Sequence, residues 1–171
     1  MTQTSFDSAI AATTTGVTVV TTEGAMGRHG LTVTSMAVVS ATPPTLLFCI
    51  DRRSPLLRAI EAHRAFAVNA VGVRQAAVAE AFAGRGREFD VARWERGGTG
   101  VPLLVGAAAR FECLVASTHD AGSHTIVIGD VMASDRGVVR ALCSKDREKL
   151  PMRRRRPARS LAISQPPKET R

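Results

Sequence analysis

The sequence predicts a single, mainly β domain with a few helices, arranged as an antiparallel barrel, and three observations support this prediction. Runs rich in Val, Thr and Ile recur along the chain between Gly and Pro turns, as in "GVTVVTTEG". Two long runs, "PLLVGAAARFECLVASTHDAG" and "SHTIVIGDVMAS", are joined by a polar turn, which favours a hairpin. The glycine fingerprints GxGxxG after a strand and GxxxxGK[ST] are absent, which argues against the common nucleotide-binding α/β folds.

The expected elements follow in order from the amino end, with about six strands and three helices in all. A short helix is expected in "FDSAIAATTTG", then strands in "GVTVVTTEG", in "HGLTVTSMAVVSATPP" and in the continuous apolar run "TLLFCIDR". A second helix, "SPLLRAIEAHR", has Ser54 as its N-cap and Pro55 at its first position. "AFAVNAV" is a further strand, and "VRQAAVAEAFAG" is a third helix that Gly84 would stop.

Composition indicates a cytoplasmic globular protein. The chain has 171 residues, of which 44% are hydrophobic, enough to bury a core without disulfides. No window approaches the ~18 uninterrupted apolar residues of a membrane span, and the first residues lack the pattern of a secretory signal. The three cysteines, Cys49, Cys113 and Cys143, form no CxxC pair, so we expect free thiols and no metal site.

The net charge of +8 lies in one part of the chain. Residues 1–136 carry 12 Arg and Lys and 12 Asp and Glu, whereas residues 137–171 carry 11 and 3. We therefore expect a neutral domain over residues 1–137 and a basic, disordered tail over 138–171. A solvated tail is the favoured interpretation, and binding to a nucleic acid or an acidic partner is the lesser alternative.

Two polar clusters are candidates for a binding site. Hydroxyl side chains are frequent in "TVTSMAVVSATPP", and the cluster Asp51, Arg52, Arg53 and Ser54 follows a strand and opens a helix. A helix N-terminus with guanidinium groups beside it suits a phosphate. Together the clusters would hold a polar ring at one end and a phosphate at the other. The alternative is that both arginines face solvent and Ser54 only caps the helix.

In their order and spacing, these segments resemble the flavin reductase domain family, the short-chain reductases that supply reduced flavin to two-component monooxygenases. The resemblance covers about residues 6–137 and rests on "GVTVVTT", "GLTVTSMAVVSATPPTLLFCIDRRS", "FAVNAVGVRQAAVAEAFAG", "EFDVARW", "GVPLLVGAAARFEC" and "GSHTIVIGDV". It implies an FMN-binding split β-barrel, usually a homodimer, that binds FMN or FAD. Hydride would pass to the flavin from NADH or NADPH, with no catalytic side chain required.

The resemblance also implies where the flavin and the nicotinamide lie. Val33, Thr34, Ser35 and Met36 would follow the isoalloxazine and ribityl chain through their backbone groups, and Ser40 matches a family serine. Asp51, Arg52, Arg53 and Ser54 would surround the phosphate, and Phe82, Ala83, Gly84 and Phe89 would lie near the phosphate or the adenosine of an FAD. His124 would lie beside the nicotinamide. Trp94 is interpreted as a packing anchor, and His29 as a loop residue.

The sequence departs from the family pattern in three places. Ser123 stands where the family has an aspartate, Val38 replaces the first serine of "SVS", and no final strand is expected from Val138 onward. The leading hypothesis is an NAD(P)H:flavin oxidoreductase that supplies reduced flavin to a separate monooxygenase. One alternative is a flavoprotein that keeps its flavin. Another is a non-catalytic flavin- or partner-binding module with a basic interaction tail.

Overall fold

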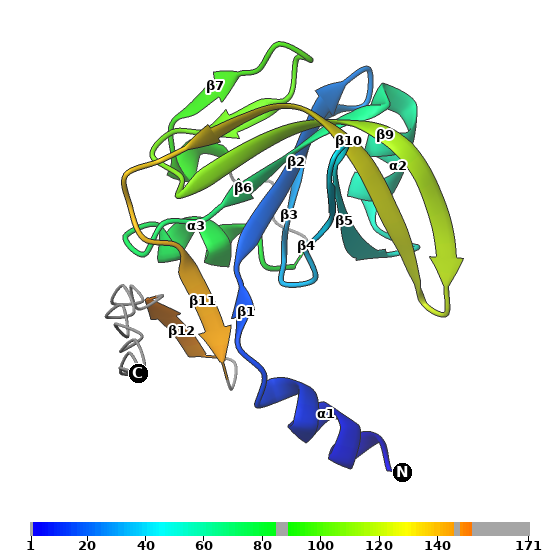
Figure 1. Cartoon of the computed structure of the whole chain (residues 1–171), viewed down its shortest axis with the longest axis vertical. Helices are drawn as coiled ribbons and strands as arrows, with labels where there is room; N and C mark the ends of the chain where they lie inside the picture. Colours follow the sequence, from blue (N-terminus) through cyan, green and yellow to red (C-terminus); the bar gives the residue numbers. More distant parts are fainter. Residues whose placement is uncertain (1, 85–88, 146–147, 152–171) are drawn as a thin grey trace, which may run out of the picture.

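The computed structural model describes residues 2–84, 89–145 and 148–151. Its main feature is a seven-stranded antiparallel sheet with the order β3-β2-β6-β9-β10-β5-β4 (Figure 1). These strands are β2 (Thr18–Gly24), β3 (Gly27–Val33), β4 (Ala37–Ala41), β5 (Pro44–Asp51), β6 (Ala65–Ala70), β9 (Ala109–Ala121) and β10 (His124–Arg136). The prediction of a mainly β, antiparallel fold is confirmed.

The remaining elements lie around this sheet. Strands β7 (Trp94–Arg96) and β8 (Pro102–Leu104) pair with each other, and β1 (Thr15–Gly16), β11 (Leu142–Lys145) and β12 (Glu148–Pro151) form a small sheet. The helices are α1 (Gln3–Ala11), α2 (Pro55–His63), α3 (Ala76–Ala81) and a 3-10 turn, η1 (Phe89–Val91). The three α-helices fall where the sequence predicts them.

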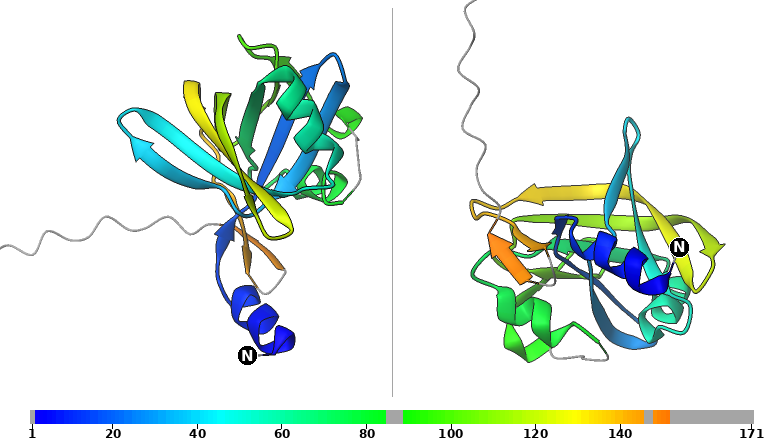
Figure 2. Two further views of the ribbon diagram at one scale, coloured as in Figure 1. Left: turned by 90° about the vertical axis from the view of Figure 1, so that its right-hand side faces the viewer. Right: turned by 90° about the horizontal axis from the view of Figure 1, so that it is seen from below.

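One hydrophobic core lies between the sheet and α2. Its buried side chains come from β2, β3, β5, β6, β9, β10 and α2. Strands β3 and β5, which are far apart in the sheet order, thus share a single core, because the sheet curls, as Figure 2 shows. Pro55 begins α2, and Leu56, Leu57 and Ile60 point into the core, as the apolar pattern predicts.

A second core lies beneath α3 and contains a cluster of three aromatic rings. The rings of Phe82, Phe89 and Trp94 meet edge to face, with centroids 4.9 to 5.6 Å apart. The Trp94 indole nitrogen donates to the Phe89 carbonyl at 2.8 Å. The interpretation of Trp94 as a packing anchor is confirmed.

Several boundaries differ from the sequence prediction because backbone turns interrupt apolar runs. "HGLTVTSMAVVSATPP" forms two strands, β3 and β4, separated by residues 34–36. The run from Pro102 likewise divides into β8 and β9, with Gly106 between them at a φ of +76°. Helix α3 ends at Ala81, before the expected stop at Gly84. His29 is buried on β3, rather than in a loop, and its Nε2 bonds the Met26 carbonyl oxygen at 3.0 Å.

The expectation that no strand follows Val138 is wrong. Strand β11 pairs with β1, and Leu142 packs into the second core with only 3% of its surface exposed. The Leu142 N–H donates to the Val71 carbonyl at 2.7 Å, and its carbonyl accepts from Val17 at 3.0 Å. The short apolar segment lies among charged residues, so its local pattern is weak. Residues 152–171, with most of the predicted basic tail, lie outside the described residues.

The cysteines are free thiols, as expected. Cys113 and Cys143 are buried, and Cys49 is half-buried. Burial raises the pKa of the Cys113 thiol to about 12, so this group stays protonated and unreactive. Within the part of the chain that the structure describes, no helix combines the length and the apolar character needed to cross a membrane.

Candidate functional site

Three segments that are distant in sequence meet at the carboxyl end of β5. The Arg52 N–H donates to the Ser123 carbonyl at 3.1 Å, which joins the start of α2 to the β9–β10 turn. The β5–β10 register places His124 directly opposite Asp51. The Ser35 hydroxyl bonds the backbone of Cys49, two residues before Asp51. The structure therefore brings residues 34–36, 51–54 and 122–124 to one end of the sheet.

An open cavity of about 560 Å³ lies at this place. Its lining residues are Asp51, Arg52, Arg53, Gly122 and Ser123. Two guanidinium groups and the start of α2 give the cavity a cationic side, which suits an anion. Ser54 occupies the N-cap position, but its side chain makes no capping hydrogen bond. Its hydroxyl therefore does not have the role of a simple helix cap.

Arg53 folds back onto Asp51. Its backbone N–H donates to Asp51 Oδ1 at 2.8 Å, and its guanidinium contacts the two carboxylate oxygens at 3.2 and 3.1 Å. These side-chain and backbone hydrogen bonds lower the pKa of Asp51 from 3.8 to about 2. The same pairing raises the pKa of Arg53.

The Arg53→Gln variant is expected to bring the pKa of Asp51 back toward 3.8. In the native protein this pKa is lowered, so the pair stabilises the fold above about pH 4 and loses its effect as pH falls toward 2. Carbon-13 NMR of the Asp51 carboxyl against pH measures the pKa in each protein. Arg52→Gln is the control, because no hydrogen bond joins Arg52 to Asp51. A pKa unchanged by Arg53→Gln would contradict the assignment.

Arg52 reaches in the other direction, to the β9–β10 turn. Its guanidinium lies 3.5 Å from an Asp120 carboxylate oxygen and 3.4 Å from the Gly122 carbonyl oxygen. The side chains of Arg52 and Asp120 are both more than half exposed, so solvent weakens this ion pair. Asp120 also accepts from the Thr125 hydroxyl at 2.9 Å. Sequence reasoning missed Asp120, because only the pairing of β5 with β10 brings it to Arg52.

His124 begins β10 and is exposed beside the cavity. Its Nδ1 shares a hydrogen bond of 2.9 Å with the Ser123 hydroxyl. The positive field of His124 makes a small contribution to the lowered pKa of Asp51. The register of β5 with β10 thus places the carboxylate of Asp51 next to the histidine.

The residues expected along the flavin ring occupy different environments. Val33 is buried at the end of β3, Thr34 is exposed, and Met36 packs against the first core. Ser40 pairs with Thr45 at the opposite end of β5 from Asp51. Its hydroxyl accepts from the Thr42 N–H at 3.1 Å within the β4–β5 turn. The structure thus does not place Ser40 beside the cationic cavity.

The expected residues after α3 are attached to β3. The Thr32 N–H donates to the Phe82 carbonyl at 2.9 Å, and the Thr32 hydroxyl donates to Ala79 at 2.7 Å. Phe82 has no exposed surface, Phe89 has 8%, and both belong to the second core. Ala83 and Gly84 are exposed, immediately before residues 85–88, which lie outside the described residues.

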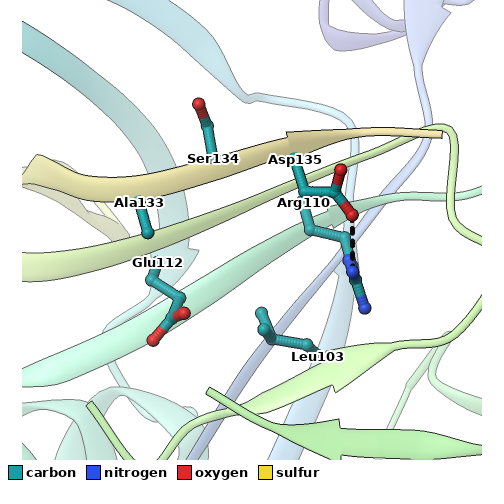
Figure 3. Close-up of a pocket in the computed structure, with 6 residues that line it drawn as sticks. All are labelled: Leu103, Arg110, Glu112, Ala133, Ser134 and Asp135. Carbon is teal, nitrogen blue, oxygen red and sulfur yellow. Dashed lines mark hydrogen bonds and ion pairs between the residues drawn. The ribbon is translucent and has the colours of Figure 1, made fainter. Parts of the chain in front are cut away.

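A smaller cavity of about 200 Å³ lies under the β7–β8 hairpin (Figure 3). Its charged groups have structural partners. Arg110 pairs with Glu95 and Asp135, and Glu112 accepts from the Thr99 N–H and hydroxyl at 3.0 Å.

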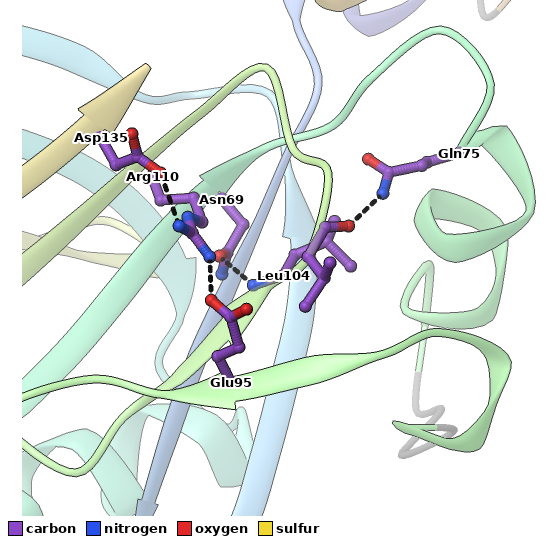
Figure 4. Close-up of polar contacts among 7 residues, drawn as sticks. Asn69, Gln75, Glu95, Leu104, Arg110 and Asp135 are labelled. Carbon is purple, nitrogen blue, oxygen red and sulfur yellow. Dashed lines mark hydrogen bonds and ion pairs between the residues drawn. The ribbon is translucent and has the colours of Figure 1, made fainter. Parts of the chain in front are cut away.

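The buried Asn69 accepts from the Leu104 N–H at 2.8 Å, and Gln75 donates to the Val105 carbonyl at the same distance (Figure 4). The Asn69 contact holds β8 to β6 of the main sheet, and the Gln75 contact holds the connection after β8 to the start of α3.

Comparisons with known proteins agree with this arrangement. Residues 10–142 match the flavin reductase like domain. The FMN reductase (NADH) SmoA of Agrobacterium fabrum is 42% identical over 128 residues, covering 75% of this chain and 74% of that protein. The flavin reductase (NADH) of Kitasatospora aureofaciens is 45% identical over 132 residues, with 75% and 69% covered.

Solved structures show the same likeness. BorF, the flavin reductase component of a bacterial two-component tryptophan halogenase, is 31% identical, with a TM-score of 0.81 over 90% of this chain and 100% of that one. The flavin reductase PheA2 is 28% identical, with a TM-score of 0.83 and the same shares covered.

The curled antiparallel sheet, together with these comparisons, identifies the class of protein as the flavin oxidoreductases with a split-barrel fold. The chain belongs to the flavin reductase like domain family. This confirms the predicted family, the predicted NAD(P)H:flavin oxidoreductase activity, and the predicted use of a flavin and a nicotinamide nucleotide.

Proposed function

We propose that this protein is an NADH-dependent FMN reductase that binds FMN at the end of β5 and releases reduced flavin to a separate monooxygenase. The observation that carries the proposal is the pair Arg52 and Arg53 at the start of α2, next to the hairpin that holds His124. The names of the relatives, FMN reductase (NADH), support FMN and NADH. BorF, a component of a two-component halogenase, supports transfer to a second enzyme.

The donor groups of the cavity fit a flavin phosphate. A phosphate dianion accepts charge-assisted hydrogen bonds, and guanidinium groups and helix N-terminal amides supply them. Arg52, Arg53 and the first turn of α2 would provide these donors, together with the Ser54 hydroxyl that does not cap the helix. Residues 34–36 lie along β5 from this point and would follow the ring.

The flavin, when bound, supplies the hydride acceptor, so the protein has to orient and shield the reactants. His124 would hydrogen-bond the nicotinamide carboxamide and fix the ring over the flavin. The Ser123 hydroxyl bonds His124 Nδ1 and so restricts the rotation of the imidazole. No side chain has to act as a nucleophile or as a general base.

His124→Ala is expected to raise the KM for NADH about tenfold, through loss of one oriented hydrogen bond, while the FMN dissociation constant stays within about twofold. Steady-state kinetics and flavin fluorescence measure the two constants. His119→Ala is the control, because His119 is an exposed histidine on the same hairpin and its Nε2 bonds the Ser117 hydroxyl, away from the cavity. Weaker FMN binding with unchanged NADH kinetics would show that this role of His124 is wrong.

The proposed function is tested by the oxidation of NADH and NADPH with purified protein, with and without added FMN or FAD. Turnover that depends on added FMN, followed by gel filtration that separates the flavin from the protein, is the expected result. Flavin that stays bound through gel filtration would favour the flavoprotein that keeps its cofactor. No turnover with any combination would favour the non-catalytic binding module.

We also propose that the protein is a homodimer. Helix α1 has no buried residue and lies away from the main sheet (Figure 2). It exposes Phe6 and Ile10, and the edge strand β4 exposes Val38 and Val39. We expect a second chain to cover these apolar side chains, since a contiguous exposed apolar patch is typical of an association surface. Light scattering during gel filtration measures the mass, and a monomer at micromolar concentration would contradict the proposal.

A further inference from the structure

We propose that Ser35 is a positioning residue for the flavin: its hydroxyl replaces strand pairing with Cys49 and so leaves the Ser35 backbone open to a ligand. This inference rests on the proposed function, because it concerns the same site. The sequence expectation concerned the backbone groups of residues 33–36, whereas this inference concerns the Ser35 side chain, which hydrogen-bonds β5.

The hydrogen-bonded pairing of β4 with β5 does not extend back along the chain to Ser35. Strand β4 begins at Ala37, which lies opposite Leu47 on β5. Continued in the same register, the pairing would put Ser35 opposite Cys49. Residues 34–36 instead leave the sheet, although β5 continues to Asp51. Without a partner, the Cys49 amide and carbonyl would remain unsatisfied on a half-buried edge.

The Ser35 hydroxyl satisfies both groups. Its oxygen accepts from the Cys49 N–H at 2.9 Å and donates to the Cys49 carbonyl at 3.1 Å. These are the two hydrogen bonds that a paired residue exchanges through its own backbone in an antiparallel ladder. One side-chain oxygen therefore holds the segment against β5 as a paired residue would.

Because the side chain of Ser35 makes these two bonds, its backbone N–H and carbonyl remain available to a ligand. Among the residues that the structure describes, none forms a hydrogen bond with the Ser35 N–H or carbonyl. The segment is also fixed on both sides, since Val33 pairs with Thr18 and Met36 packs on the first core. A held segment with an unused amide and carbonyl can bond the donor and acceptor groups of a flat heterocycle without reorganising first.

The experiment compares Ser35→Ala with Ser35→Thr, which keeps the hydroxyl, and with Thr45→Val as the matched control. Thr45 lies on β5 in the same hairpin, but its hydroxyl bonds the Pro43 carbonyl in the turn. Two quantities are measured. Amide hydrogen exchange at Cys49 in the flavin-free protein reports the contact, and the dissociation constants of FMN and riboflavin report its effect on binding.

We expect Ser35→Ala to speed exchange at Cys49 about tenfold and to weaken FMN and riboflavin equally, by about tenfold, because the loss lies on the ring side of the flavin. Ser35→Thr restores all three values, and Thr45→Val changes none. If Ser35→Ala does not fold, Ser35→Cys keeps the shape with weaker hydrogen bonding and gives changes in the same direction.

The proposal is overturned if exchange at Cys49 is unchanged in Ser35→Ala, or if it rises while flavin affinity stays the same. Weaker binding of FMN with unchanged binding of riboflavin would also overturn it, because such a difference would show that Ser35 affects the phosphate site and not the ring. If the native protein binds no flavin, the proposed function fails, whereas exchange at Cys49 still tests the contact itself.

Discussion

Replacing Arg52 and Arg53 together with glutamine is expected to weaken FMN binding about a hundredfold and to leave riboflavin binding within about twofold. Riboflavin lacks the phosphate, so only FMN loses these contacts. A charge-assisted hydrogen bond contributes about 1.5–3 kcal/mol. In the ligand-free protein both guanidinium groups already contact aspartates, so Asp51 and Asp120 compete with a phosphate for these donors. We therefore expect the two arginines to contribute about half of the binding free energy that two such hydrogen bonds would give without this competition.

Fluorescence titration of each flavin measures this effect, at low and at physiological salt. The difference in FMN affinity between the native protein and the double variant should become smaller as the salt concentration rises, because the site is open to solvent. Arg58→Gln is the matched control, since Arg58 is an exposed arginine on α2 outside the cavity. An equal loss of FMN and riboflavin in the double variant would mean that the arginines do not bind the phosphate.

Phe82→Ala is expected to lower the free energy of unfolding by about 3–5 kcal/mol. The ring has no exposed surface and packs against both Phe89 and Trp94. It also fills the space that Gly30 leaves on β3, where an added Cβ would lie 2.5 Å from the Phe82 ring. Removing the ring would open a cavity between β3 and the segment after α3. Urea denaturation followed by Trp94 fluorescence or circular dichroism measures the loss.

Two further variants separate packing from flavin contact at this position. Met26→Ala removes an exposed apolar side chain in the β2–β3 turn and should change stability by less than about 0.5 kcal/mol. Phe82→Leu keeps most of the core volume and should retain FMN affinity. Weaker FMN binding in Phe82→Leu at unchanged stability would show that Phe82 contacts the flavin, as the family resemblance implied.

The sequence predicted those elements whose signals are local. The β-rich run "GVTVVTTEG" and the apolar run "TLLFCIDR" form β2 and β5, and the segment with Pro55 at its start and an apolar face forms α2. A β-branched or apolar run between turns, and an apolar stripe with a period of 3.6 residues, can each be recognised in a short window of sequence. The cluster from Asp51 to Ser54 was found in the same way, because a strand end and a helix start are both visible locally.

Only the tertiary structure decided which groups meet. The register of β5 with β10 places His124 opposite Asp51. The course of the chain before β4 brings the Ser35 hydroxyl into hydrogen-bonding distance of the Cys49 backbone. The packing of Leu142 likewise made a strand of a segment with little pattern of its own. A local pattern specifies which face of a strand is buried. It does not specify the partner strand or the register, which depend on closing long loops and on fitting one shared core.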